Sequence, residues 1–272
     1  MFSNYEDKIN EVWSNRSLLK ESIYQNVIKE IIELLDKGKV RVSEPSDKGW
    51  LLNEWVKKAV LLYFPLLKTK VTEIGPFEFY DKIKLKTGYE KLGVRVVPHA
   101  IARYGAYLAK GVVMMPCYVN LGSYINEGTM IDTWATVGSC AQVGKNVHIS
   151  GGVGIGGVLE PVQASPVIIE DDCFLGSRCV IVEGARIEKE AVLGANVIIT
   201  KSTKIIDVSG PEPKEYKGIV PTRSVVIPGS YTKDFPSGKY QVPCALIIGK
   251  RKASTDLKTS LNETLREYGI VI

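Results

Sequence analysis

Aliphatic or aromatic residues recur at every sixth position along the middle of this chain. The first run of the repeat comprises Ile101, Tyr107, Val113, Val119, Ile125, Ile131, Val137, Val143, Ile149 and Ile155. The same spacing returns in Ile169, Leu175, Ile181, Ile187, Leu193, Ile199 and Ile205. A period of six matches neither the 3.6-residue period of a helix nor the two-residue period of a simple strand. The repeat therefore requires a structural unit larger than either.

Small residues mark a second position of the same repeat. The residue four places after each repeat position is mostly small: Gly105, Gly111, Cys117, Ser123, Thr129, Ala135, Ala141, Cys173, Cys179, Ala185 and Ala191, with Val147, Val153 and Val197 as larger members. One large and one small inward residue in every six predict a triangular prism, in which three sides form one coil. The coils stack as parallel β-structure ~4.8 Å apart. Because 155 and 169 are fourteen apart, a loop within 156–166 must leave the prism.

The segments on either side of the repeat have different patterns, and three regions are expected: 1–95, 96–207 and 208–272. In the first region, apolar residues spaced three and four apart predict a helix over 4–37 and another over 53–64, with Pro65 ending the second. The third region is expected to be a small α+β extension. It ends in a helix over 259–269, with Ser260 and Glu263 as its cap. The expected strands outside the prism are 77–86, 93–97, 221–230 and 240–250.

Composition excludes several classes of protein. No apolar run approaches the ~20 residues of a membrane helix, and the first residues lack the basic and apolar regions of a signal peptide. A cytoplasmic protein without a membrane partner is therefore expected. Five cysteines without a CxxC pair argue against a disulfide framework or a zinc ribbon, and with only His99 and His148 no metal site is expected. The net charge of +5 is scattered along the chain and does not indicate a nucleic-acid partner.

Function must be sought on the outward positions, because the inward residues form the core. Residues eighteen apart stack on one face, and the loop adds eight to that interval, so Asp132 lies beside Ser150, Gly176 and Gly194. One acid and three very small residues predict a shallow groove in which a long ligand could lie against the backbone. Two plainer interpretations stay open: the glycines only ease the corners of the coil, and Asp132 is a solvated surface acid.

The segment from 128 to 178, GTMIDTWATVGSCAQVGKNVHISGGVGIGGVLEPVQASPVIIEDDCFLGSR, resembles the tetrahydrodipicolinate N-succinyltransferases. The likeness extends over roughly 94–250. It implies a left-handed parallel β-helix of the hexapeptide-repeat acyltransferases, mainly β, with a helical N-terminal domain. It also implies transfer of succinyl from succinyl-CoA to the amino group of ring-opened L-2,3,4,5-tetrahydrodipicolinate, a step toward diaminopimelate and lysine. No permanently bound cofactor is implied, since succinyl-CoA is a co-substrate, and the family forms homotrimers with active sites between neighbouring prisms.

The resemblance assigns roles to two residues. Asp132, in MIDTW, matches the acid that contacts the reacting amine, and it could orient the amine and accept its proton. Arg95, in VRVVP, matches an arginine that binds a substrate carboxylate, for which a guanidinium is well suited. For the coenzyme, the stacking of coils makes candidates of Ser150, Gly156, Gly157, Gly176, Ser177 and Gly194, and its phosphates are expected near Lys201 and Lys250. Position 180 departs from the family: valine stands where many members have a glutamate, so Asp132 is expected to carry more of the proton transfer.

Two other functions remain open. The same acceptor could be acetylated from acetyl-CoA, and the residue that would discriminate is a cation for the carboxylate of the succinyl group. A non-enzymatic structural β-helix is the more distant alternative, although the outward residues vary from coil to coil instead of forming flat repeated rows.

Overall fold

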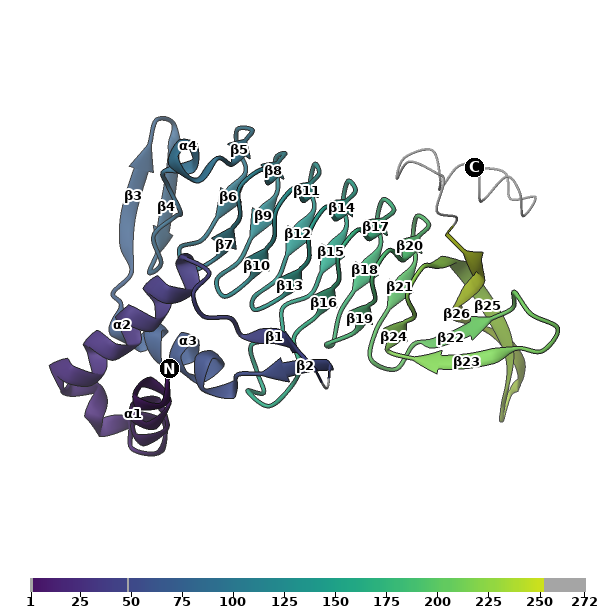
Figure 1. The fold of residues 1–272 in the computed structure, drawn as a ribbon, viewed down its shortest axis with the longest axis horizontal. Coiled ribbons are helices and arrows are strands. Elements are labelled where there is room, and N and C mark those ends of the chain that lie inside the picture. The colour runs from purple at the N-terminus through teal and green to yellow at the C-terminus, as the bar shows by residue number, and fades with distance from the viewer. Residues whose placement is uncertain (1, 48, 252–272) are drawn as a thin grey trace.

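The computed structural model describes residues 2–47 and 49–251, and Figure 1 shows helices at one end of a long prism and long strands at the other. The helical end contains α1 (Ser3–Ser14), the 3-10 helix η1 (Arg16–Lys20), α2 (Ser22–Asp36), α3 (Glu54–Leu66) and the short α4 (Tyr89–Leu92). Two hairpins accompany them: β1 (Ser43–Ser46) with β2 (Gly49–Leu52), and β3 (Lys70–Ile74) with β4 (Phe77–Asp81). Within the described residues, no helix is long and apolar enough to cross a membrane.

The expected helix over 4–37 is interrupted, and the second helix ends later than predicted. Asn15 leaves the helical conformation and caps η1, because its side chain accepts a hydrogen bond from the backbone of Ser17. Pro65 lies inside the last turn of α3, which ends when the amide of Leu67 donates to Phe64. The expected strand over 77–86 stops at Asp81, and its partner β3 was not predicted.

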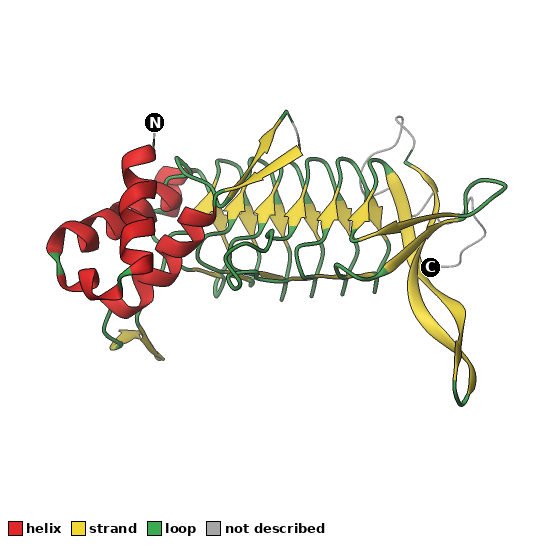
Figure 2. Ribbon diagram, turned by 90° about the horizontal axis from the view of Figure 1, so that it is seen from below, coloured by secondary structure: helices red, strands yellow, loops and turns green. Residues whose placement is uncertain are grey.

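The prism has three faces of parallel two-residue strands, which confirms the predicted parallel β-helix (Figure 2). The first face contains β5 (Arg95–Val96), β8 (Val113–Met114), β11 (Met130–Ile131), β14 (His148–Ile149), β17 (Phe174–Leu175), β20 (Val192–Leu193) and the start of β25 (Ser224–Phe235). The second contains β6 (Ile101–Ala102), β9 (Tyr118–Val119), β12 (Thr136–Val137), β15 (Gly154–Ile155), β18 (Val180–Ile181) and β21 (Ile198–Ile199). The third contains β7 (Tyr107–Leu108), β10 (Tyr124–Ile125), β13 (Gln142–Val143), β16 (Ile168–Ile169), β19 (Arg186–Ile187) and β24 (Ile219–Val220).

The six-residue register is confirmed from Val119 to Ile199 and is wrong in the first coil. The inward residues of the first coil are Ala102, Leu108 and Met114, each one place after the residue expected to face inward, and all three are buried. The step from Met114 to Val119 is therefore five residues, because the turn between β8 and β9 is one residue short. Consequently Gly105 and Gly111 are left-handed turn residues, and their predicted inward places are taken by Ala106 and Val112.

A second excursion leaves the prism after β21. Ile205 is buried, as expected, but its strand β22 (Lys204–Asp207) pairs with β26 (Gly238–Lys250) and not with the third face. The place beside Ile187 is taken by Val220, after β22 and β23 (Lys214–Lys217) have formed a hairpin. The strand expected over 240–250 lies within β26, whereas the strand expected over 221–230 begins only at Ser224, and β25 and β26 form one long hairpin. The helix expected over 259–269 lies outside the described residues.

The helical end packs against the prism and holds the loop that follows β15. Lys57 on α3 is fully buried, and its ammonium donates hydrogen bonds of 3.0 Å to the carbonyl of Pro161 and 2.8 Å to that of Ala164. Burial lowers the pKa of Lys57. The predicted excursion within 156–166 is therefore tied to α3 at two points, and it lies against the helical end instead of over an open face.

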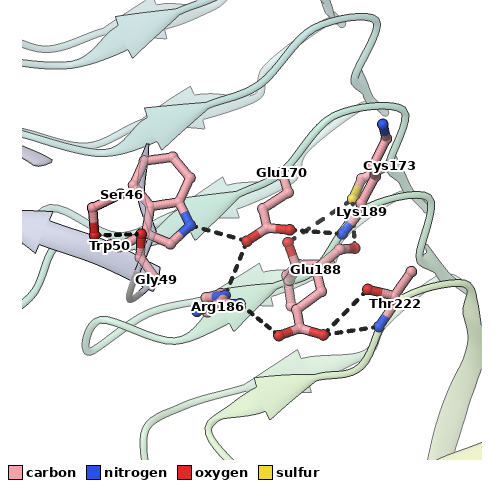
Figure 3. Close-up of polar contacts among 10 residues, drawn as sticks. Ser46, Gly49, Trp50, Glu170, Cys173, Arg186, Glu188, Lys189 and Thr222 are labelled. Atoms are coloured by element: carbon pink, nitrogen blue, oxygen red, sulfur yellow. Dashed lines mark hydrogen bonds and ion pairs between the residues drawn. The ribbon is translucent and has the colours of Figure 1, made fainter. Parts of the chain in front are cut away.

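A chain of polar contacts fastens the β1–β2 hairpin to the third face (Figure 3). Trp50 donates to Glu170 at 2.9 Å, and the same carboxylate lies 3.0 Å from Nε of Arg186. Arg186 then binds Glu188 at 2.6 Å, and Glu188 accepts from the backbone of Thr222 at 3.1 Å. These contacts join the N-terminal hairpin to successive coils, so these charges are engaged in holding the fold together.

Candidate active site

The turns between the first and second faces, called here the first corner, carry the predicted catalytic acid. These turns are residues 97–100, 115–117, 132–135, 150–153, 176–179 and 194–197. Asp132 is the single acidic residue among them. The pairing of β11, β14, β17 and β20 confirms the predicted column, since it places Asp132 beside Ser150, Ser150 beside Gly176, and Gly176 beside Gly194.

The Asp132 carboxylate is held by its own turn. One oxygen, Oδ1, accepts 2.7 Å from the amide of Thr133 and 3.2 Å from the hydroxyl of the same residue. This is the local bonding that favours aspartate in turns. In the part of the chain that the structure describes, the second oxygen has no hydrogen-bond partner, so it is available to a ligand on the half-buried outer surface of the corner.

Arg95 lies on the first face, which leads into the corner that carries Asp132. It occupies the outward position of β5, where it is exposed and pairs beside Val113, which in turn pairs beside Met130. Two strand spacings, about 10 Å, separate Arg95 from Met130, and Asp132 lies two residues further along the chain. The structure therefore presents a cation and an acid on one surface, far enough apart for a small dicarboxylate to lie between them.

Two exposed rings stand beside Asp132 at the first corner. The His99 and Trp134 rings have centroids 5.5 Å apart, and Trp134 is 65% exposed. Trp134 has a φ of +61°, a left-handed conformation that is uncommon for a bulky residue. The same conformation occurs at turns of other corners, for example at Cys140 and Asp172, so it is a regular feature of the coil. Trp134 was not predicted from the sequence. It could have been found from its place in the repeat, because the equivalent turn position is Gly152 in the next coil and Asn196 in a later one, and a tryptophan is unusual there.

The cysteines of the prism are core residues. All five cysteines of the chain are free and buried. Burial, with a smaller contribution from Asp132, raises the pKa of Cys117 to about 12, and burial likewise raises the pKa of Cys179 to about 12. A thiol with such a pKa is almost entirely protonated at neutral pH and is a poor nucleophile.

The residues nominated for the coenzyme do not line one groove. Ser150, Gly176, Ser177 and Gly194 lie together at the first corner. Gly156 and Gly157 lie at the second corner, between the second and third faces, where Gly138 is their neighbour in the preceding coil. Lys201 also follows the second face, whereas Lys250 bonds to Thr222 and Ser224 at the corner between the third and first faces. These residues are separated because six residues of chain make one side of the prism, so a residue six places further on lies at the next corner.

The glycines at the first corner also have a packing role. A methyl group added at Gly176 would lie 2.7 Å from backbone atoms of Leu193, Gly194 and Ala195 in the next coil. One at Gly194 would lie 3.3 Å from the carbonyl of Val226. Close stacking of the coils therefore requires Gly176, and Ser150, Gly176 and Gly194 are all buried in the chain as described.

The departure at position 180 lies around the corner from Asp132. Val180 is an outward, half-buried residue of the second face, between Gly154 and Ile198. His148, an outward residue of the first face, stacks on Phe174 with ring centroids 4.9 Å apart. Among the described residues, no group of three His, Cys, Asp or Glu side chains could hold a metal ion.

Comparison with known proteins identifies close relatives. A family model for the N-terminal part of tetrahydrodipicolinate N-succinyltransferases matches residues 4–66, and one for the hexapeptide repeat of succinyl-transferases matches residues 166–201. The 2,3,4,5-tetrahydropyridine-2,6-dicarboxylate N-succinyltransferase of Bordetella petrii is 47% identical over 276 residues, covering 98% of this chain and 100% of that protein. The enzyme of the same name from Cupriavidus metallidurans is 51% identical over 271 residues, covering 95% of this chain and 97% of that protein.

The fold also has a counterpart among solved structures. A Campylobacter jejuni crystal structure assigned as a 2,3,4,5-tetrahydropyridine-2-carboxylate N-succinyltransferase superposes with a TM-score of 0.52 at 18% identity. The match covers 87% of this chain and 64% of that one, so it bears on the fold alone.

Proposed function

This chain belongs to the tetrahydrodipicolinate N-succinyltransferase family, and from that premise we propose how the first corner performs the reaction. The chain is an acyltransferase that moves succinyl from succinyl-CoA to the amino group of ring-opened L-2,3,4,5-tetrahydrodipicolinate. The products are N-succinyl-2-amino-6-oxopimelate and CoA, on the route to diaminopimelate and lysine. The identity of about one half over nearly the full length of both chains supports this assignment.

Asp132 is the proposed catalytic residue. The neutral amine attacks the thioester carbonyl, the carbon–sulfur bond breaks, and the sulfur leaves as CoA thiolate while the nitrogen loses a proton. A carboxylate beside the amine can orient it and accept that proton. The observation that carries this role is the arrangement of Asp132: Oδ1 is fixed by Thr133, and the other oxygen is open at a corner with no second acid.

Arg95 and the exposed ring pair are proposed to bind the acceptor. A guanidinium can hold a carboxylate with two parallel hydrogen bonds, and Arg95 is exposed on the face that leads to Asp132. His99 and Trp134 would form one wall of the same site, since their rings stand at the corner next to Asp132.

The coenzyme is proposed to lie along the column of small residues below Asp132. Ser150, Gly176, Ser177 and Gly194 remain the candidates there, because their column runs down the prism from the acid. Lys201 and Lys250 would contact phosphates only if the ligand, or a neighbouring subunit, brought the phosphates to the other corners. The net charge of +5 favours the approach of these anionic ligands over distance.

A homotrimer in the cytoplasm completes the proposal. Exposed apolar residues beside the first corner, Trp134 at 65% and Ile198 at 54%, offer surface that a second prism could cover. Five free thiols suit a reducing compartment.

The test is release of CoA thiol from succinyl-CoA, with and without tetrahydrodipicolinate, beside the same assay with acetyl-CoA. Acceptor-dependent release with preference for succinyl-CoA is expected. Asp132→Asn should lose most turnover and keep the oligomeric state of the wild type. Preference for acetyl-CoA would refute the donor, and near-normal turnover of Asp132→Asn would refute the role of the acid.

A further inference from the structure

A second bulky residue with left-handed backbone lies at the first corner, two coils from Trp134. Arg178 has a φ of +63°, and its amide donates to the carbonyl of Gly151, whose neighbour Gly152 donates to Thr133 in the turn of Asp132. The turns that contain Asp132, Gly152 and Arg178 therefore follow one another down the corner, one coil spacing of ~4.8 Å apart each.

The Arg178 side chain turns back over Gly152, toward Asp132. A methyl group placed on Gly152 would lie 2.7 Å from Cδ of Arg178, 2.8 Å from Nε and 3.1 Å from Cζ. Those distances are too short for contact, so the arginine lies in a seat that exists only because residue 152 is a glycine. The guanidinium therefore lies about one coil below the turn of Asp132.

The Arg178 guanidinium has no partner in the part of the chain that the structure describes. Arg103, Arg186 and Arg223 each pair with a carboxylate, whereas no ion pair, hydrogen bond or ring contact engages the charged group of Arg178. Its left-handed position suits Gly or Asn, and the next coil has Asn196 there. An unpaired arginine that lies over Gly152, next to the turn of Asp132, points to a ligand that carries an anion.

We infer that Arg178 binds the free carboxylate of the succinyl group and sets the preference for succinyl over acetyl donors. This rests on the proposed function. With the thioester carbon next to Asp132, a four-carbon acyl chain that runs along the first corner by about one coil, toward Gly152, places its carboxylate at the guanidinium. An acetyl group has no carboxylate and cannot use this contact, so the arginine adds affinity for one donor alone.

The experiment measures kcat/KM of Arg178→Asn for succinyl-CoA, acetyl-CoA and butyryl-CoA, the last being a donor of matched chain length without the carboxylate. Asparagine suits the left-handed turn, so the fold is expected to persist. A hydrogen-bonded charge is worth roughly 1.5–3 kcal/mol, which corresponds to a loss of roughly 10- to 150-fold with succinyl-CoA. The values for acetyl-CoA and butyryl-CoA should change less than about 3-fold, because neither donor makes this contact.

Lys189→Gln, at an exposed cation on another corner, removes the same charge and should leave all three donors unchanged. An equal loss with every donor, or no loss with succinyl-CoA, overturns the role of Arg178. Should Arg178→Asn not fold, Arg178→Lys provides the same test, because it keeps the charge but not the two-point contact. Absence of acceptor-dependent thiol release by the wild type with every donor would instead refute the proposed function.

Discussion

Replacing Gly176 by alanine is expected to separate two coils of the prism. The added methyl group would meet backbone atoms of Leu193, Gly194 and Ala195 at 2.7 Å, about 0.7 Å inside ordinary contact. Backbone cannot rotate away as a side chain can, so the strain falls on the hydrogen bond from Gly176 to Leu193, now 2.8 Å long. Overpacking costs about 1–3 kcal/mol and a weakened buried hydrogen bond about 1 kcal/mol more, which gives about 2–4 kcal/mol.

Gly154→Ala is the matched control. Gly154 also lies on the prism without a left-handed φ, but a methyl group there would meet nothing within 4 Å. It should leave the free energy of unfolding unchanged or raise it by about 0.5 kcal/mol. Urea unfolding followed by circular dichroism, at one fixed protein concentration, measures both variants, and the melting temperature of Gly176→Ala should fall by about 4–16 °C. Equal stability of the two variants would refute the packing argument.

The further predictions concern Lys57, Cys117 and Arg95. Lys57→Met should lower the free energy of unfolding by about 1–3 kcal/mol, because two carbonyls of the loop after β15 lose their donor. The pKa of Lys57 is lowered in the folded state, so the unfolded chain binds more protons between that pKa and about 10.5. The free energy of unfolding of the wild type, relative to that of Lys57→Met, should therefore rise with pH in that range. A fall with pH would contradict the lowered pKa. Iodoacetamide at pH 8 should leave Cys117 of the native enzyme unlabelled, since a pKa of about 12 leaves about 0.01% thiolate against about a quarter for an ordinary cysteine, and rapid labelling without unfolding would refute its burial. Arg95→Gln should raise the KM for tetrahydrodipicolinate at least about 10-fold while the KM for succinyl-CoA stays unchanged, and equal changes in both would show that Arg95 does not bind the acceptor.

The sequence predicted the prism register well from Val119 onward and failed in the first coil, which precedes the shortened turn between β8 and β9. In the first coil, Tyr107 faces outward, yet its ring lies under Gly38 of the helical end and 4.7 Å from the ring of Tyr124. Ile101 likewise lines the cleft beneath the β3–β4 hairpin. Because neighbouring segments cover these positions, the outward residues are as apolar as the inward ones, and spacing alone selected the wrong member of each pair.

The sequence predicted which site residues stack on one another along the prism axis, but not which residues of different corners lie in one site. The column from Asp132 to Gly194 follows from the eighteen-residue coil, and the pairing of strands confirms it. Arg178 was beyond that reasoning, since its importance depends on the direction of its side chain over Gly152, and a period fixes only where the backbone lies.

The corners of the prism tolerate changes in length that its faces do not. The turn before β9 has lost a residue, and the chain leaves the prism after β15 and again after β21, yet the ladders on either side keep their pairing. Lengthening a loop whose ends are already fixed adds little entropic cost. For protein engineering, the corners are therefore sites where a peptide can be inserted. A peptide placed after a chosen strand of the second face would project at a chosen position along the prism axis, in steps of one coil, without altering the core beneath it.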